Sequence, residues 1–449
     1  MTMRAFLSVL VAAGVLSSAG AAVYHVSPTG CDTNAGTEAL PWLTVQKAAS
    51  SVAPGDTVLI RNGQYKEHVV ITRSGAPGKP ITFANYPGHA PEIDAAQDLP
   101  ADDPSQPPRR RRGLGRFSTV QLFNVTNVHV RGLNLANGSV SGFYAQNCDS
   151  ISVRECHIHY TMSSGIKIIK CTNVIIDNNE IERACLRSAE EAVTVKIFSE
   201  HVQVSSNHVH HSDTEGIDIK EGSRNVRVFG NHVHDMRRQG LYTDAWNVPT
   251  FNVSFYDNIV HDCAMGITVG AETGGLLSNV WVFNNVVYNC KWPGLIVAGW
   301  GDRANIGPML DIRFVNNTIH NCGGSDNWNG ALSFETGMAS NVLVRNNIFS
   351  RCAPPLIAVK QAAAAVTIDH NLFFGESSVK GTAFVEGDPK FANAAAGDFR
   401  LLPGSPAIGK GSSAGAPRTD FDGVVRPDGH CDIGAFQAAP TSTGATAPQ

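Results

Sequence analysis

The stretch NVRVFGNHVHDM, from Asn225 to Met236, recurs with variation along most of the chain. The next copy, NVSFYDNIVHDC, runs from Asn252 to Cys263. The second Asn of each copy marks the repeat, and these marker residues are Asn179, Asn207, Asn231, Asn258, Asn285, Asn317, Asn347 and Asn371. Their spacings of 24 to 32 residues fit one coil of three short strands. A period of this length predicts a solenoid.

Each copy alternates apolar and polar residues before its marker Asn. Val226 and Val228 alternate with Arg227 and Phe229, which is the period of a strand with one buried face. Stacking such strands in parallel predicts an all-β fold, a single-stranded right-handed parallel β-helix. The marker Asn is expected at a turn, in the left-handed region of the backbone, where stacked amides can bond one another.

Two segments are expected to close the ends of the solenoid. Thr44 to Val52 predicts an N-capped amphipathic helix that covers the first coil. After Asn371 the repeat gives way to a Gly/Pro-rich segment, which is expected to wrap back along the outside. We therefore expect one β-helix domain over residues 23–436, followed by a disordered tail over residues 437–449.

Residues 1–22 have the features of a signal peptide. Arg4 supplies a positive charge, Phe6 to Leu16 an apolar stretch, and Ala19 to Ala21 a cleavage site of small residues. We therefore expect a secreted protein, extracellular or periplasmic. No other apolar run is long enough to span a bilayer, and the formal net charge of -4 gives no general basic field. Neither a membrane nor nucleic acid is expected as a partner, and we expect a monomer.

Three further patterns favour structural roles. A second ladder, expected to consist of buried thiols or inter-coil pairs, is formed by Cys263, Cys290, Cys322 and Cys352. A metal site is disfavoured there, because a ladder spreads ligands along a line. The HVH segments at 208–210 and 232–234 are expected on another face, as a surface or turn ladder and not as a zinc site. The run Arg109 to Arg112, in the insert Ala96 to Phe117, is expected in a solvated loop.

A second set of segments in the same coils predicts a sheet with chemical groups on its outer face. These segments include GIDIKEG from Gly216, GLYTDAW from Gly240 and GITVGAE from Gly266. Their second and fourth residues are apolar and face the core, so the third and fifth face outward. The outward residues are Lys167, Thr194, Lys196, Asp218, Lys220, Tyr242, Asp244, Thr268 and Ile296, with Glu221, Trp246, Glu272 and Trp300 just beyond.

Carboxylates, lysines and aromatic rings are expected to meet in an open groove on the middle coils. Carboxylates on adjacent coils repel, which raises the pKa of one while its neighbour stays ionised. Glycoside hydrolysis needs such an acid/base pair. We predict Asp244 as nucleophile or base and Glu272 as acid, with Asp218 and Lys220 adjusting their charge. The residues predicted to bind a polysaccharide or oligosaccharide substrate are Tyr242, Trp246, Trp300, Glu221 and Thr268.

The chain resembles the pectate-lyase-like superfamily of right-handed parallel β-helix proteins over roughly residues 23–436. The stretch YHVSPTGCDTNAGTEALPWLTVQKAASSVAPGDTVLIRNGQY from Tyr24, and the closing SPAIGKG and DIGAFQ, are widespread in that group. Members include polysaccharide lyases, glycoside hydrolases, epimerases and phage tailspikes. The resemblance implies a substrate bound in a groove on the face of a parallel sheet.

Calcium-dependent pectate lyases of the superfamily bind the metal through clustered Asp residues and abstract a proton with Lys or Arg. Here the matching positions before the strands hold Glu191, Glu215 and Gln239, and the doubled Asp is absent. The pattern IDIKEGS, YTDAW and AETGG is more similar to glycosidase-type or uncharacterised members, in which an Asp and a Glu on successive coils act. A glycoside hydrolase without cofactor or metal is therefore expected.

Two alternatives remain. The first is a polysaccharide lyase that acts on a uronic-acid polymer with Lys220 or Lys196 as its base, for which calcium is possible. The second is a carbohydrate-binding adhesin or tailspike-like module without catalysis.

Overall fold

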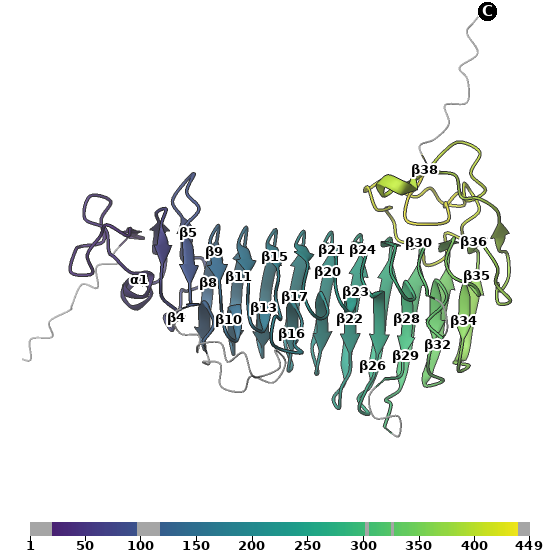
Figure 1. Ribbon diagram of the computed structural model, residues 1–449, viewed down its shortest axis with the longest axis horizontal. Coiled ribbons are helices and arrows are strands. Elements are labelled where there is room, and N and C mark those ends of the chain that lie inside the picture. Colours follow the sequence, from purple (N-terminus) through teal and green to yellow (C-terminus); the bar gives the residue numbers. More distant parts are fainter. Residues whose placement is uncertain (1–19, 97–116, 301–304, 325–326, 439–449) are drawn as a thin grey trace, which may run out of the picture.

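The computed structural model describes residues 20–96, 117–300, 305–324 and 327–438. Three parallel sheets run along the long axis of the molecule, and each coil of the chain adds one strand to each sheet in turn (Figure 1). The prediction of a parallel β-helix is confirmed. Most of the predicted signal peptide, residues 97–116 of the insert with its arginine run, and most of the predicted disordered tail lie outside the described residues.

Sheet A begins each coil. Within the described residues its strands are, in order, β1 (Val23–Val26), β2 (Thr57–Ile60), β5 (Ile81–Asn85), β8 (Thr126–Arg131), β11 (Asp149–Arg154), β14 (Thr172–Asp177), β17 (Glu200–Ser205), β20 (Arg224–Phe229), β23 (Thr250–Tyr256), β26 (Leu277–Phe283), β29 (Met309–Val315), β32 (Ala339–Arg345) and β35 (Ala364–Asp369).

Sheet B follows after a tight turn and has shorter strands. They are β3 (Gln64–Tyr65), β6 (Glu92–Asp94), β9 (Asn134–Ala136), β12 (His157–His159), β15 (Glu180–Glu182), β18 (His208–His210), β21 (His232–His234), β24 (Ile259–His261), β27 (Val286–Tyr288), β30 (Thr318–His320), β33 (Ile348–Ser350), β36 (Leu372–Phe374) and β37 (Val385–Glu386).

Sheet C completes the coil and contains the predicted chemical residues. Its strands are β4 (Val69–Ile71), β7 (Val120–Phe123), β10 (Ser141–Gln146), β13 (Ser164–Ile169), β16 (Val193–Lys196), β19 (Ile217–Lys220), β22 (Gln239–Asp244), β25 (Met265–Gly270), β28 (Leu295–Ala298), β31 (Leu332–Phe334) and β34 (Ile357–Val359).

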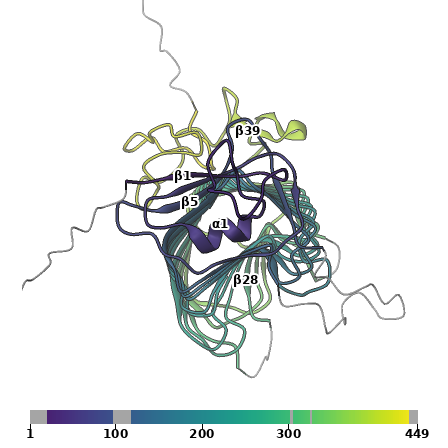
Figure 2. The ribbon, with the colours of Figure 1, turned by 90° about the vertical axis from the view of Figure 1, so that its left-hand side faces the viewer.

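The first coil is covered by a short helix, α1 (Val45–Ser51), as predicted (Figure 2). Thr44 is its N-cap and accepts a hydrogen bond from the backbone N–H of Lys47. The helix buries Val45, Ala48 and Ala49 against the coil. It thereby shields backbone groups at the end of the sheets that would otherwise be open to another chain. No helix within the described ranges is both long and apolar enough to cross a membrane.

The marker asparagines form a buried ladder at the turn between sheets A and B. Asn258 Oδ1 accepts hydrogen bonds from the backbone N–H and the side-chain Nδ2 of Asn231, both at 3.0 Å. Asn258 in turn donates through Nδ2 to Asn285 Oδ1 at 2.9 Å and to the Val228 carbonyl at 3.0 Å. The same pairing connects consecutive markers from Asn179 to Asn371. The predicted stacking of amides is confirmed.

The predicted backbone conformation of the marker asparagines is wrong by one residue. The left-handed conformation belongs to the residue before each marker, as at Asp257, where φ is 53°, and at Asn284, where φ is 54°. The chain leaves the sheet A strand at that position, so the bend occurs there. The marker that follows then points its amide into the turn, where it bonds the next coil.

The interior is filled by apolar residues from all three sheets and by thiols. All ten cysteines lie in the described part of the chain, none forms a disulfide, and nine are buried. The ladder of buried thiols is therefore confirmed, and the alternative of inter-coil disulfide pairs is wrong. Neighbouring thiols follow the coil spacing, as where the backbone N–H of Cys322 approaches Cys352 Sγ at 3.3 Å.

The segment after the last coils folds back along their outside, as predicted. It contains β38 (Phe391–Asn393), the 3-10 helix η3 (Ala394–Ala396) and β39 (Asp398–Leu401). The buried Arg426 donates to Asn284 Oδ1 at 3.0 Å. Asn346 Nδ2 donates to the Ser412 carbonyl at 2.8 Å. The segment is thus attached to the turns between sheets A and B. The outer face of sheet C is bordered by other loops.

We predict that Asn258→Ala lowers the free energy of unfolding by about 3 kcal/mol, because it leaves the buried backbone N–H of Asn231 without an acceptor. The shift in denaturant midpoint, followed by circular dichroism, measures this effect. Ser254→Ala, on the outer face of the same coil, is the control and should leave the midpoint unchanged. Equal midpoints for the two variants would contradict a structural role for the ladder.

Candidate functional site

Sheet C places the predicted chemical residues in adjacent rows. Asp218 is in register with Tyr242 on the next coil, and Lys220 is in register with Asp244. Ile217 and Ile219, which alternate with Asp218 and Lys220 along the strand, are fully buried and face the core. The predicted division into inward and outward residues is therefore confirmed for these strands.

The site is less open than the sequence suggested. Asp218 and Asp244 are each 1% exposed, and Tyr242 is 4% exposed. The expectation of an open groove at these carboxylates is wrong, because side chains in rows about 4.8 Å apart cover one another. The ring of Trp246 also lies beside Lys220, with the ammonium 6.0 Å from a ring centroid.

Lys220 lies among the carboxylates of neighbouring coils. Its Nζ is 2.5 Å from Glu191 Oε1 and 3.5 Å from Asp218 Oδ2. Burial lowers the pKa of Lys220, but the charges of Asp218 and Glu191 outweigh it and raise the pKa above its ordinary value. Lys220 is therefore protonated near neutral pH.

Within the described residues, three carboxylates on these coils each have one oxygen without a hydrogen-bond partner. These buried atoms are Glu191 Oε2, Glu215 Oε2 and Asp218 Oδ1. The other Glu215 oxygen accepts from Arg238 Nη1 at 3.0 Å. Buried acceptors are usually paired, so these oxygens are suited to an additional donor, such as a sugar hydroxyl, or to a hard cation.

Asp244 and Glu272 lie next to each other, as predicted. The backbone N–H of Glu272 approaches Asp244 Oδ1 at 3.3 Å, and the Tyr242 hydroxyl donates to Glu272 Oε1 at 2.6 Å. Burial raises the pKa of Asp244 to about 8, and the charge of Glu272 adds to this rise. Asp244 thus retains its proton at neutral pH, and Glu272 accepts hydrogen bonds.

The remaining predicted residues lie around this centre. Thr268 is fully buried, and its hydroxyl has no hydrogen-bond partner among the described residues. Lys196 lies one coil before Lys220. Its Nζ is 3.1 Å from Glu190 Oε2 and 3.9 Å from Glu221 Oε1. Among the predicted aromatic residues Trp246 is 43% exposed.

The predicted sugar-binding Trp300 belongs to an aromatic cluster that sequence reasoning found only in part. Its ring lies 6.2 Å from Tyr242 and 6.0 Å from Trp328. Trp292 stands 5.5 Å from Trp328. Trp292 and Trp328 were missed because they lie in loops, where the repeat pattern sets no position. The cluster offers flat apolar surface beside the carboxylates.

Glu191 and Glu215 were considered only at the positions that match calcium ligands in related lyases, and Arg238 was not predicted to belong to the site. Glu191 and Glu215 each come directly before the first residue of a sheet C segment, in AEEAV and DTEGI. That shared position is a signal for neighbouring side chains on adjacent coils. Arg238 lies in the loop before β22 and carried no comparable signal.

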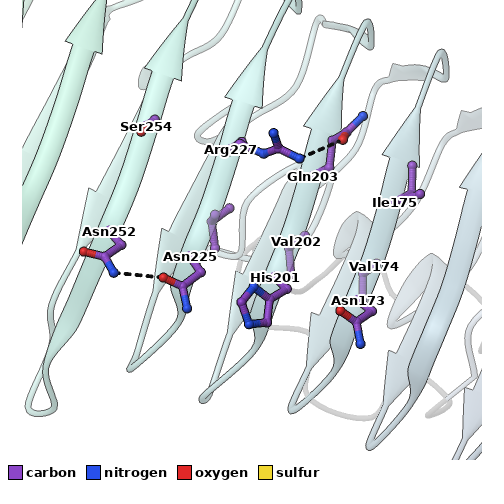
Figure 3. Close-up of a pocket in the computed structure, with 11 residues that line it drawn as sticks. Asn173, Val174, Ile175, His201, Val202, Gln203, Asn225, Arg227, Asn252 and Ser254 are labelled. Carbon is purple, nitrogen blue, oxygen red and sulfur yellow. Dashed lines mark hydrogen bonds between the residues drawn. The ribbon is translucent and has the colours of Figure 1, made fainter.

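A hollow lies on the outer face of sheet A (Figure 3). It has a volume of about 570 Å³ and is lined by β14, β17, β20 and β23. Hydrogen bonds join Asn252 Nδ2 to Asn225 Oδ1 at 2.8 Å and Arg227 Nη2 to Gln203 Oε1 at 3.4 Å. Its lining contains no carboxylate and no lysine. Its one titratable residue besides Arg227 is His201, whereas sheet C combines carboxylates with lysines.

Two family models match the chain. Residues 24–185 match the family described as "Pel9A-like, right handed beta helix region", and residues 141–308 match the one described as "Right handed beta helix region". Together the matches extend from the first strands to the coils of the candidate site.

Two known proteins are similar in sequence. The uncharacterized protein YwoF of Bacillus subtilis is 24% identical over 453 residues, which cover 85% of this chain and 91% of YwoF. The pectate lyase PEL9 of Emericella nidulans is 28% identical over 167 residues, which cover 32% of this chain and 41% of that protein.

Three solved structures share the fold. XylC in complex with xylose has a TM-score of 0.58 at 13% identity, and the alignment covers 93% of this chain and 98% of the XylC chain. Pectate lyase Pel9A has a TM-score of 0.57 at 14% identity, covering 94% and 97%. The family 28 exopolygalacturonase of Yersinia enterocolitica has a TM-score of 0.55 at 13% identity, covering 83% and 77%.

Identities this low establish the fold and not the reaction. The handedness in both family descriptions agrees with the sequence prediction. The chain is a right-handed parallel β-helix protein with a fold that is shared with carbohydrate-active enzymes, both lyases and hydrolases.

Proposed function

We propose that the protein hydrolyses glycosidic bonds of a polysaccharide or oligosaccharide with Asp244 and Glu272. The observation that supports this most is their contact. Glu272 accepts a hydrogen bond from Tyr242, and its backbone N–H approaches the raised-pKa carboxyl of Asp244. One protonated and one hydrogen-bond-accepting carboxyl side by side is the arrangement that glycoside hydrolysis uses.

The proposal exchanges the two roles expected from the sequence. Asp244 holds a proton up to about pH 8 and is the general acid that protonates the leaving glycosidic oxygen. Glu272 is the nucleophile, or the base that activates water. The reason for the exchange is burial, since Asp244 is 1% exposed whereas Glu272 is partly accessible.

The surroundings support a sugar as the ligand. Unpaired oxygens of Glu191, Glu215 and Asp218 are acceptors for hydroxyl groups, and the rings of Trp246 and Trp300 suit the apolar faces of pyranose rings. We further propose that the protein is exported, because residues 1–22 have the composition of a signal peptide.

A second candidate is β-elimination by a lyase. The three unpaired carboxylate oxygens favour it, because such hard oxygens fit calcium. A calcium ion there would neutralise the carboxylate of a uronate substrate, but Glu191, Glu215 and Asp218 are not among the groups of described residues that converge closely enough to hold an ion. Lys220, the nearest base, is held protonated by Asp218 and Glu191, which makes the lyase the weaker candidate.

We predict that Asp244→Asn and Glu272→Gln each reduce kcat/KM by at least about 100-fold, since each removes an acid/base group. Release of reducing ends from a panel of polysaccharides and oligosaccharides measures the loss. Ser254→Ala, on sheet A, should retain full activity. Full activity in either carboxyl variant would exclude the assignment, and binding without cleavage by the unmodified protein would favour a carbohydrate-binding module.

The raised pKa of Asp244 also predicts a pH-dependent gain in stability on substitution. The pKa of Asp244 is about 4 in the unfolded chain and about 8 in the folded protein. The folded protein therefore loses stability as pH rises from the first value to the second. Asp244→Asn removes that loss. The melting temperature of the variant, relative to the unmodified protein, should be nearly unchanged at pH 4 and several degrees higher at pH 8.5. An equal difference at both pH values would contradict the raised pKa.

The two candidate reactions give different products. Hydrolysis gives no new chromophore, whereas elimination from a uronate polymer gives an unsaturated product that absorbs in the ultraviolet. We predict no rise in ultraviolet absorbance during cleavage and no loss of activity with a calcium chelator. A rise in absorbance that is abolished by the chelator and by Lys220→Ala would replace the hydrolase with the lyase.

A further inference from the structure

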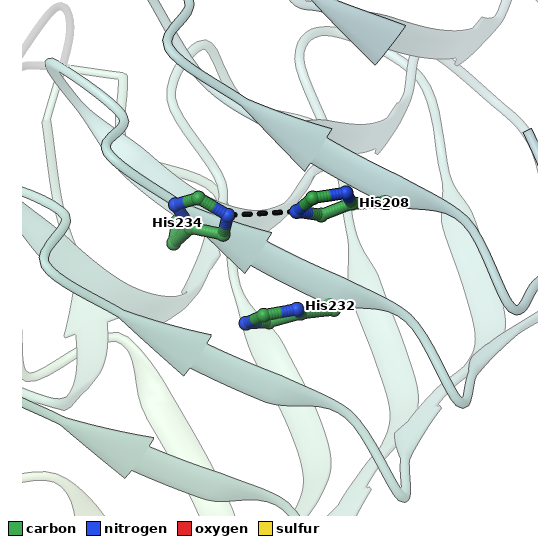
Figure 4. A group of neighbouring side chains, drawn as sticks. All are labelled: His208, His232 and His234. Carbon is green, nitrogen blue, oxygen red and sulfur yellow. Dashed lines mark hydrogen bonds between the residues drawn. The ribbon is translucent and has the colours of Figure 1, made fainter. Parts of the chain in front are cut away.

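Histidines gather on the outer face of sheet B, in the same coils as the candidate site but in another sheet (Figure 4). His208 lies on β18, and His232 and His234 lie on the adjacent β21. One donor atom from each of the three lies within 4.8 Å of the others. Val209 and Val233, between these histidines on their strands, are fully buried, which fixes the imidazoles on the outside.

The ring nitrogens converge closely. His208 Nε2 and His234 Nε2 are 2.8 Å apart, and the rings of His208 and His232 stack at 5.0 Å. A tetrahedral ion with bonds of 2.0 to 2.1 Å separates its ligand nitrogens by about 3.4 Å. A shift of about half an ångström would separate the nitrogens of His208 and His234 to that distance, whereas His232 would also have to turn its ring from His261 toward them.

Carboxylates lie behind the imidazoles, on the side away from the convergence point. His234 Nδ1 is 2.6 Å from Asp235 Oδ2, and His208 Nδ1 is 4.0 Å from Glu180 Oε1. A histidine that binds a metal through Nε2 commonly donates its Nδ1–H to a carboxylate, which orients the ring. Asp235 already holds His234 in that orientation, with Nε2 directed at His208.

We propose that His208, His232 and His234 bind one divalent transition-metal ion, of which zinc is the representative. Neutral imidazole nitrogens suit such ions. The proton that joins the two Nε2 atoms would move to Nδ1 of His208, which faces Glu180. Because the ligands come from two adjacent coils, the bound ion would join β18 to β21.

The expectation of a plain surface ladder is the competing explanation. A stack of hydrogen-bonded imidazoles needs no ion, and the pair His232 Nε2 and His261 Nε2 at 2.8 Å continues the pattern. A carboxylate also lies behind His261, where Asp262 Oδ2 is 2.7 Å from Nδ1, so what distinguishes the proposed site is its third donor. This inference is independent of the proposed hydrolase activity.

The test uses the full chain, free of any polyhistidine tag and stripped with a chelator, titrated with zinc chloride in a calorimeter. We expect one zinc ion per chain and a higher melting temperature with zinc. His208→Gln and His234→Gln should each weaken zinc binding by more than about tenfold, as should Asp235→Asn through loss of ring orientation. His201→Gln, on the outer face of sheet A, is the matched control and should bind zinc as the unmodified chain does.

Two further measurements keep the outcomes apart. Asp218→Asn tests whether zinc binds instead at the acidic cluster of sheet C, and it should leave zinc binding unchanged. Cleavage by His234→Gln should equal that of the unmodified protein. Absence of zinc binding, or unchanged zinc binding in both His208→Gln and His234→Gln, would overturn the proposed metal site.

Discussion

The architecture depends on the constraint that each coil stacks in register on the one before it. The buried amides maintain this register, because each marker Asn accepts hydrogen bonds from both the backbone and the side chain of its neighbour, as Asn258 does from Asn231. An amide accepts and donates in one fixed direction, so the ladder tolerates little slippage. Every outward side chain consequently lies about 4.8 Å from its counterpart on the next coil. Rows of like residues, whether thiols, imidazoles or carboxyls, follow from that spacing.

Stacking in rows also determines the electrostatics of the candidate site. Side chains about 4.8 Å apart exclude water from one another, and a charge that loses water must find a partner or give up its ionised form. Lys220 forms an ion pair with one oxygen of Glu191, and Arg238 forms one with Glu215. Burial raises the pKa of Asp244 to about 8, and it also raises the pKa of Asp218 and of Glu215 although each has a cation beside it. Acid/base chemistry requires carboxyls with different pKa values. Such differences arise here because the coils stack regularly while charged residues occupy only some positions in each row.

The fold and the membership of the central rows could be predicted from the sequence, because both follow from periodicity. Asp218, Asp244 and Tyr242 occupy the positions that alternation assigns to them. What periodicity could not predict was accessibility and protonation. The burial of Asp244 depends on side chains in neighbouring rows and loops, and its proton depends on that burial. Arg238 and the loop tryptophans lie outside the repeat, where conformation is set by tertiary contacts alone.

The choice between the two reactions rests on which group carries a removable proton. A lyase needs Lys220 neutral, yet its ammonium is bound by Glu191 and lies near Asp218, so deprotonation would leave two buried carboxylates without their cation. A hydrolase needs Asp244 protonated, and burial already favours that form. A neutral Lys220 would leave unpaired negative charge on sheet C. A protonated Asp244 adds no such charge. For this reason we propose hydrolysis in preference to elimination.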